Sequence, residues 1–455
     1  MQAATVSRRD AWILLAALGA LVCVSVPMLG SEPWDFRPGT VHATGLFAAF
    51  VRGVDGEWDS EALRAPALLG GVLVALAAAF VPLRAVWPRW SAIALTAVVA
   101  CLLAVPAVVL QTSLRQSSEP WFFTNDSTYQ IELAGKLLRD GENPYGHDYS
   151  HSGLERFYSL DGSVSDETRR DQVALRHFAY FPGTALTAAV WTALPDPLSD
   201  YRFFVLLATL AGLAVGLAFP GPLVPRLVVG ALLAASPLAV RAAWFGTADA
   251  PSLVLTVLAF ALVARRRLGW AAASLAVAVL FKQFALVALP FLALAAWQTW
   301  PRRDVWRATA LFAGIVALGI LPFFAWDPGA FWADTIEYGG RTYRIVGYGL
   351  SGLLVKAGIA SRTGAYPFLP LLVLVWLPLT AWLLWLQRRA AALWPAATGF
   401  AISIFMLIFL GRVFHGSYLV WPLAGIAVAA LLALSVDEPA RSRHSSAEDT
   451  RVEPR

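Results

Sequence analysis

The sequence predicts an all-α protein that crosses a membrane many times, with about 12 transmembrane helices. Of its 455 residues, 58% are apolar and only 14% are charged, and the mean hydropathy is +0.62. A soluble globular domain has a far more polar composition. Apolar runs of about 17 to 25 residues, long enough to cross roughly 30 Å of hydrocarbon as a helix, recur from Trp12 to the region of Ser435. The protein is therefore expected to be polytopic and helical.

Arginine in the short turns between apolar runs sets the predicted orientation. Lysine occurs only at positions 136, 282 and 356, so arginine supplies most of the basic residues behind the formal net charge of +5. Residues 265–267, 301–304 and 387–389 form basic turns, and such turns stay on the cytoplasmic side. No basic stripe interleaved with aromatics occurs outside the loops, so no nucleic-acid partner is expected. This pattern predicts a multi-pass protein of the cell membrane with both termini in the cytoplasm.

The expected helices follow from the apolar runs in chain order. The first three span about residues 12–29, 65–83 and 91–110, and Arg84 and Arg89 place the turn between the second and third inside. No small-residue cleavage site follows the first run cleanly, so it is assigned as a membrane helix and not as a signal peptide. Nine more helices are expected at about residues 203–219, 223–240, 252–264, 268–280, 285–297, 307–325, 367–386, 393–410 and 419–435.

Two segments depart from regular spans. Residues 181–194 are apolar but short and bounded by prolines, and we expect them to lie along the outer surface, because a crossing there would force the basic 265–267 turn outside. The runs on either side of Lys282 are short, which predicts a broken helix pair meeting near the outer side, with Pro290 kinking the second helix. The outer face then receives a long loop, residues 111–202, in which Asp and Glu outnumber Arg and Lys.

Asp126 is the first candidate for chemistry, because it lies in an acidic and aromatic segment just after the third expected helix. A carboxylate at the membrane surface can accept a proton from an incoming hydroxyl. Asn125 stands beside it and Tyr129 lies about one helical turn later. The alternative is that Asn125 and Asp126 cap the helix that the following residues predict. Both interpretations stay open. Cys23 and Cys101 lie inside apolar spans, which excludes a disulfide framework and a cysteine metal site.

Several basic residues are expected on the outer face, where they are disfavoured unless they bind an anion. Lys282 lies between two apolar half-spans and could contact a lipid phosphate or extend to the headgroups. Arg341 and Arg344 carry guanidinium groups, which suit phosphate, although they could equally be solvated loop charges. His415 precedes the last helix and has either a structural or a chemical role. Asp249, which opens an expected helix, is most simply a cap.

These residues resemble a known family, the polytopic GT-C glycosyltransferases that use polyprenyl-phosphate sugars, and within it the actinobacterial mannosyltransferase-like (glycosyltransferase 87-like) branch. The resemblance covers about residues 120–422 and departs from the usual layout in one respect, because family members carry the acidic motif after their first helix and here it follows the third. It rests on Asn125-Asp126 with Tyr129, on Gly141-Glu-Asn-Pro-Tyr145, on Tyr180-Phe-Pro-Gly183, on Lys282-Gln283, and on His415 with Tyr418.

The resemblance implies three regions and a reaction. Residues 1–90 would be an N-terminal two-helix addition, residues 91–436 the transmembrane catalytic domain with its extracytoplasmic loop, and residues 437–455, which contain few apolar residues, a disordered cytoplasmic tail. The implied reaction moves a sugar, with mannose or arabinose as first choices, from a polyprenyl-phosphate donor to a hydroxyl of a glycolipid or polysaccharide outside the cytoplasm, with inversion. No second acid stands beside Asp126 in the manner of metal-dependent members, so neither a metal nor another cofactor is expected.

The resemblance also implies roles for single residues. Asp126 would be the general base, and Lys282, Arg341, Arg344 and His415 would bind the donor phosphate. The residues expected to line the sugar and acceptor groove are Asn125, Tyr129, Asn143, Tyr145, Tyr180, Gln283 and Tyr418.

Two other classes of protein compete with this interpretation. A multi-pass transporter or lipid flippase would also have about 12 helices, and it predicts paired broken helices in two related halves. The sequence indicates only one broken pair, at Lys282. A non-catalytic membrane scaffold predicts that the outer-face cations do not gather near Asp126.

Overall fold

The computed structural model describes residues 5–29, 44–52, 61–84, 86–117, 126–155, 175–342, 344–390 and 392–436. Nearly all the regular structure in this part of the chain is helical, which confirms the predicted all-α class. The described strands are short and form two pairs. β1 (Thr5–Ser7) runs antiparallel to β2 (Val86–Pro88), and β3 (Val346–Gly347) runs parallel to β4 (Val413–Phe414).

The N-terminal half contains the first long helices and the helices of the long loop. In chain order these are α1 (Arg8–Ser25), α2 (Ala48–Val51), α3 (Glu61–Phe80), α4 (Arg89–Ser117), α5 (Asp126–Arg139) and α7 (Pro182–Trp191). Short 3₁₀ turns, Val26–Met28 and Val81–Leu83, extend α1 and α3. With 10 residues, α7 is only about 15 Å long at 1.5 Å per residue, roughly half of the bilayer's hydrocarbon thickness. It is therefore too short to cross, and its place along the outer surface stays a prediction.

The C-terminal half continues the bundle with α8 (Tyr201–Ala218), α9 (Leu223–Ala235), α10 (Pro237–Phe245), α11 (Asp249–Ala264), α12 (Leu268–Phe281), the 3₁₀ helix η5 (Gln283–Ala288), α13 (Leu289–Thr299), α14 (Arg302–Trp326), α15 (Pro328–Trp332), the π-helix η6 (Ala333–Thr342), α16 (Leu350–Lys356), α17 (Phe368–Leu371), the π-helix η7 (Leu372–Trp376), α18 (Leu377–Gln387), α19 (Trp394–Leu410), the 3₁₀ helix η8 (Gly416–Leu419) and α20 (Val420–Val436).

Eight helical stretches in the described residues are long and apolar enough to cross a membrane, which supports the membrane assignment. They are Arg8–Met28, Arg64–Leu83, Arg89–Ser113, Tyr201–Ala218, Leu223–Phe245, Arg302–Trp326, Phe368–Gln387 and Gly416–Ser435. Four shorter apolar helices accompany them: Asp249–Ala264, Leu268–Phe281, Gln283–Thr299 and Trp394–Leu410. Each stretch overlaps one of the expected helices.

The chain breaks at Lys282 as predicted. α12 ends at Phe281, and Lys282 is extended, with φ −153° and ψ 131°, before η5 begins. The predicted kink at Pro290 is wrong in detail, because α13 begins at Leu289 and Pro290 occupies its first turn. A proline there gives up an N–H that has no partner within the helix anyway.

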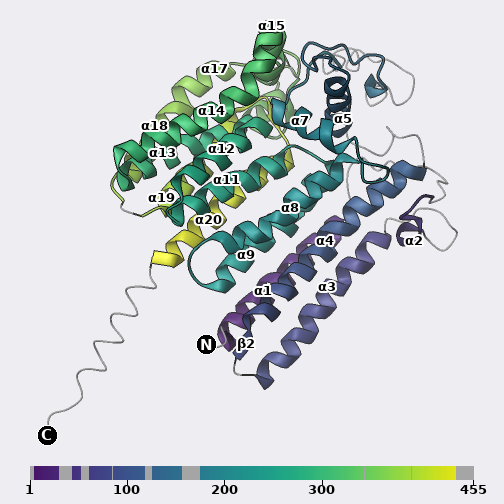
Figure 1. The fold of residues 1–455 in the computed structure, drawn as a ribbon, viewed down its shortest axis with the longest axis vertical. Helices are drawn as coiled ribbons and strands as arrows, with labels where there is room; N and C mark the ends of the chain where they lie inside the picture. The colour runs from purple at the N-terminus through teal and green to yellow at the C-terminus, as the bar shows by residue number, and fades with distance from the viewer. Residues whose placement is uncertain are drawn as a thin grey trace.

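The ends of the helices gather in two sets, as Figure 1 shows for α5 and α7 at one end of the long helices and β2 at the other. In the set predicted to be cytoplasmic, Arg265 Nε donates to the Ala218 carbonyl at 2.7 Å, Ser435 Oγ to Pro220 O at 3.2 Å, and Gln298 Nε2 to Arg388 O at 3.1 Å. The opposite ends carry α5, α7 and the broken helix. The side of the membrane on which each set lies stays a prediction.

The first two long helices share a core with the rest of the chain. Buried side chains of α1, α3 and α4 pack with buried side chains of α8, α9 and α10 in one apolar cluster. Representative members are Leu14, Leu18, Leu103, Leu227 and Ala234. The predicted N-terminal addition is thus held against the bundle by α4 and α9.

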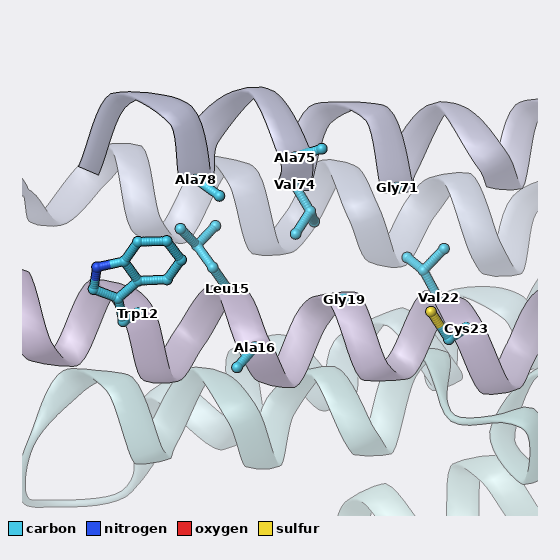
Figure 2. Close-up of a pocket in the computed structure, with 10 residues that line it drawn as sticks. All are labelled: Trp12, Leu15, Ala16, Gly19, Val22, Cys23, Gly71, Val74, Ala75 and Ala78. Carbon is cyan, nitrogen blue, oxygen red and sulfur yellow. The ribbon is translucent and has the colours of Figure 1, made fainter. Parts of the chain in front are cut away.

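An apolar groove of about 330 Å³ lies between α1 and α3 (Figure 2). Its lining consists of Trp12, Leu15, Ala16, Gly19, Val22, Cys23, Gly71, Val74, Ala75 and Ala78. None of these side chains carries a charge.

Two glycines let α7 lie tightly between α5 and α12. A Cβ atom on Gly135 of α5 would lie 2.6 Å from the Ala188 backbone, and one on Gly183 of α7 would lie 2.7 Å from the Leu280 carbonyl oxygen. Real Cβ contacts are never this short, so both positions need glycine. The long loop is therefore fixed against the end of α12, directly before Lys282.

A buried ionic network fixes α5 to α4 and α8. Arg115 of α4 binds Glu132 of α5 with two hydrogen bonds, 2.8 and 2.6 Å long, and lies 3.3 Å from Asp200. Asp200 in turn accepts from Arg202 Nε at 2.9 Å, and Glu132 Oε1 also accepts the Tyr201 N–H at 3.0 Å. Burial alone would raise the pKa of Asp200, but Arg202 and Arg115 hold it well below its usual range. Asp126, at the start of α5, takes its position from this network.

Replacing Glu132 by alanine should destabilise the protein strongly. The substitution removes the bidentate partner of Arg115 and the acceptor of the Tyr201 N–H. Breaking a buried ion pair at one partner costs about 3–5 kcal/mol, so the free energy of unfolding should fall by that amount. Glu142→Ala is the matched control, because that side chain is 58% exposed and its loss should matter by less than about 0.5 kcal/mol. Equilibrium unfolding in detergent measures both, and equal stability of the two variants would contradict the role of the network.

Candidate functional site

Lys282 and Asp249 form a buried ion pair at the helix break. Because Lys282 leaves the helix in an extended conformation, its side chain turns toward the first turn of α11, where Asp249 lies. The Lys282 Nζ is 2.7 Å from Asp249 Oδ1, and the two side chains are 10% and 2% exposed. A charge buried among apolar helices needs a counter-ion of this kind.

Aromatic residues complete the surroundings of this pair. Trp421 of α20 donates its indole N–H to the same Asp249 oxygen at 2.8 Å. The Lys282 ammonium also lies 4.4 Å from the centre of the Tyr418 ring and 4.8 Å from that of Phe284, within cation–π distance.

Two sequence-based alternatives are corrected by this geometry. Lys282 does not extend toward lipid headgroups, because its ammonium binds Asp249 inside the protein. Asp249 does not cap α11. The N-cap residue is Ala248, without a side-chain hydrogen bond, and the Asp249 carboxylate binds Lys282 and Trp421 instead.

His415 lies next to the ion pair. Its ring meets Tyr418 edge to face at 5.5 Å. Burial lowers the pKa of His415, an effect opposed by Asp126 and Asp249 and reinforced by Lys282 and Arg241. The imidazole is therefore neutral near pH 7, and these four charged groups influence its pKa.

Arg241 and Tyr348 lie next to the loop that carries His415. A Cβ atom on Gly416, the residue after His415, would lie 3.3 Å from Arg241 Nη1 and 2.5 Å from the Tyr348 hydroxyl. The pairing of β3 with β4 brings the segment that follows Arg344 alongside this loop, and Val346 N donates to the Arg412 carbonyl at 3.1 Å.

Asp126 and Tyr180 belong to the same group. Asp126 begins α5, is half-buried, and accepts the Ser127 N–H at 2.7 Å. Burial raises the pKa of Tyr180. Its hydrogen bond with Ser127 opposes this, and Tyr418, Asp126 and Asp249 add to it. The Tyr180 hydroxyl therefore stays protonated and can donate a hydrogen bond. The structure brings together what we call the polar cluster: Asp126, Ser127, Tyr180, Arg241, Asp249, Lys282, His415 and Tyr418.

Two other predicted site residues, Tyr145 and Asn143, lie beside the polar cluster and contact the segment of Tyr180. Tyr145 is only 3% exposed, packs on Phe178 and Phe331, and donates its hydroxyl to the Tyr180 carbonyl at 2.9 Å. Asn143 Oδ1 accepts the Tyr145 N–H at 3.1 Å, which closes a local turn. These two residues therefore support the position of Tyr180.

The remaining predicted site residues are not members of the polar cluster. The Tyr129 hydroxyl donates to Ser152 O at 2.9 Å, and Gln283 Nε2 donates to Thr335 O at 3.4 Å. Arg344 lies in the segment that precedes β3. Asn125 and the side chain of Arg341 lie outside the described residues.

A second polar group, which the sequence did not indicate, joins the long loop to η6. Asp334 of η6 is 1% exposed, and its Oδ1 lies 2.7 Å from His177 Nδ1. Its Oδ2 accepts the N–H groups of Gly146 at 2.9 Å and Phe178 at 3.1 Å. No local sequence pattern indicates this pair, because 157 residues separate Asp334 from His177.

No three His, Cys, Asp or Glu side chains of the described residues lie together as ligands for a metal ion. The expectation that no cofactor takes part stays a prediction.

Comparisons of this chain with models of protein families, with curated proteins and with solved structures found no match.

The lowered pKa of His415 predicts a loss of stability in acid. Its pKa in the folded protein lies below the value of 6.5 expected for an exposed histidine, so protons bind the unfolded chain first. The stability that the neutral ring contributes is complete above about pH 6.5 and is lost as the pH falls through the folded pKa. The thermal unfolding midpoint from about pH 7.5 to about pH 5 should fall less steeply in His415→Gln than in the wild type. Parallel curves would show that His415 does not carry this dependence.

Proposed function

We propose that the protein is an inverting glycosyltransferase of the GT-C kind. It transfers a sugar, mannose or arabinose, from a polyprenyl-phosphate donor to a hydroxyl of a glycolipid or polysaccharide on the extracytoplasmic side of the cell membrane. The observation that carries the proposal is the polar cluster, which places a half-buried carboxylate, Asp126, with Lys282, Arg241 and His415 at one end of an apolar helical bundle.

The proposed topology has twelve crossings. The eight long apolar stretches and the four shorter ones would each cross once, with both termini in the cytoplasm. The two sets of helix ends support this path, because the basic turns and the polar cluster lie on opposite sets.

The proposed reaction uses Asp126 as general base. The acceptor hydroxyl gives its proton to the Asp126 carboxylate while its oxygen bonds to the anomeric carbon. The bond from that carbon to the phosphate oxygen breaks, and its electron pair leaves with the polyprenyl phosphate. The attack on the opposite face inverts the anomeric carbon.

The cations of the cluster would stabilise the leaving phosphate. An ammonium has three N–H donors, and Asp249 holds Lys282 so that the others can serve an anion. Arg241 adds a planar guanidinium, and neutral His415 can donate one N–H. Arg341 and Arg344 are proposed to contact the same phosphate. Asn125, Tyr129, Tyr180, Gln283 and Tyr418 would line the groove for sugar and acceptor, with Asn143 and Tyr145 behind them.

A transporter or lipid flippase is the second candidate, because one observation favours it. The buried pair of Lys282 and Asp249 lies at a broken helix, as in carriers that bind ions or protons near mid-membrane. Proteoliposomes distinguish the two functions. A transporter moves labelled polyprenyl-phosphate sugar across the bilayer without a new glycoside, and a transferase forms the glycoside.

Asp126→Asn should reduce transfer by about 10²- to 10⁴-fold, because the amide cannot accept the proton. The assay uses proteoliposomes with radiolabelled polyprenyl-phosphate mannose or arabinose. Asp148→Asn is the control, since Asp148 is an exposed carboxylate on the same loop, and it should retain wild-type activity. Unchanged transfer by Asp126→Asn would remove Asp126 as the base, and no transfer by the wild type from any such donor would overturn the proposed function.

Lys282→Ala should weaken the binding of the donor more than that of the acceptor. A hydrogen bond from a charged group contributes about 1.5–3 kcal/mol, so the donor KM should rise by about 10- to 100-fold. Lys282→Gln keeps a neutral hydrogen-bond donor to Asp249. It tests whether the folding lost in Lys282→Ala can be restored without restoring the affinity for the sugar donor. Lys356→Ala, an exposed lysine, serves as the control. Equal donor affinity in wild type and Lys282→Ala would contradict the phosphate role.

A further inference from the structure

His177 is oriented by a buried carboxylate, one oxygen of which already accepts two backbone N–H groups. Asp334 Oδ2 accepts two backbone N–H groups, from Gly146 and Phe178, which leaves Oδ1 to face the imidazole at 2.7 Å. With Asp334 as the acceptor of this contact, as it is for the two backbone N–H groups, His177 Nδ1 carries the hydrogen. In the neutral ring the lone pair is then on Nε2, the nitrogen on the far side from Asp334.

The ring is held in this orientation from several sides. It stacks on Tyr338 with a centroid distance of 4.8 Å and an interplanar angle of 26°. Tyr338 and Asp334 both belong to the π-helix η6, a form that is frequent at functional sites. The His177 carbonyl accepts Gln130 Nε2 from α5 at 2.9 Å, which fixes the backbone. The side chain nevertheless stays 21% exposed, so a solute can reach it.

This group borders the polar cluster. Tyr180 follows His177 by three positions, and Gln130 lies on the helix that Asp126 begins. Gln283, next to Lys282, contacts Thr335, next to Asp334. The two groups are thus linked through the long loop, through α5, and through the contact between Gln283 and Thr335.

We propose that His177, oriented by Asp334, is an acceptor-binding residue of the site: its Nε2 accepts a hydrogen bond from a hydroxyl of the carbohydrate acceptor. The inference rests on the proposed function and names the group that receives the acceptor. A hydroxyl-bearing ligand suits the site because the imidazole offers an acceptor atom, whereas the donor phosphate is an anion and needs the cations of the polar cluster.

A purely structural role predicts something different from the same contacts. If the contact between His177 and Asp334 only joins the long loop to η6, any side chain at position 177 that donates a hydrogen bond to Asp334 should preserve the function. His177→Asn is such a variant, since its amide nitrogen can replace Nδ1 while nothing replaces Nε2. His177→Gln, which reaches the position of Nε2, is its counterpart.

Modification by diethyl pyrocarbonate tests the binding of a carbohydrate without any turnover. The wild-type protein in nanodiscs is treated alone, with octyl α-mannoside or octyl α-arabinofuranoside, and with undecaprenyl phosphate, and modification of each histidine is read by mass spectrometry. We expect His177 to react and to be protected by at least one glycoside but not by undecaprenyl phosphate. His147, a loop histidine that is 32% exposed, should react equally throughout. Absence of glycoside protection at His177 would overturn the inference.

Kinetics give the second readout. His177→Asn should raise the acceptor KM by about ten-fold or more and leave the donor KM unchanged, with a thermal unfolding midpoint close to that of the wild type. Wild-type acceptor KM in a folded His177→Asn variant would overturn the inference and leave the proposed transferase standing. If the wild-type protein transfers no sugar, the proposed function fails, and the protection experiment still decides whether His177 binds a glycoside.

Discussion

A charge buried among apolar helices must be paired, and this constraint organises the end of the molecule that carries α5, α7 and the helix break at Lys282. Three buried carboxylates, Glu132, Asp249 and Asp334, each join segments that are distant in sequence. Glu132 fixes α5 to α4 and α8, Asp249 fixes the broken helix to α11 and α20, and Asp334 fixes the long loop to η6. The free energy that such pairs contribute is less important here than their geometry, because an unpaired member is costly and alternative arrangements are therefore disfavoured.

The sequence predicted the parts of this arrangement that depend on local pattern. Apolar runs located the helices, and a lysine between two short runs located the break at Lys282. Pairing could not be predicted in the same way. Asp249 lies 33 residues before Lys282, and Trp421 lies 172 residues after Asp249, so their contact depends on how α11, α12 and α20 pack. Asp249 opens a helix, which made capping the simplest interpretation from sequence.

The same limitation applies to the aromatic residues of the long loop. Tyr145 and Tyr180 were both expected to line the groove, yet Tyr145 is buried behind the site and Tyr180 faces Ser127. Sequence alone does not distinguish an aromatic residue that supports a site from one that lines it. Asp334 and His177 were missed for a related reason, because neither stands in a recognisable motif and only the fold brings them together.

The two carboxylates of the polar cluster, Asp126 and Asp249, differ in how far their side chains are exposed, and a general base must contact its substrate. Asp249 Oδ1 already accepts an ammonium at 2.7 Å and an indole N–H at 2.8 Å, and its side chain is 2% exposed. Those donors occupy this oxygen, and burial keeps a substrate hydroxyl away. Asp126 lies at the start of α5 and is half-buried, so it is more exposed than Asp249. Asp249 is therefore suited to holding Lys282 for an anion, and Asp126 to receiving a proton. In the proposed transferase, Asp249 would therefore position Lys282, and the more exposed Asp126 would be the base.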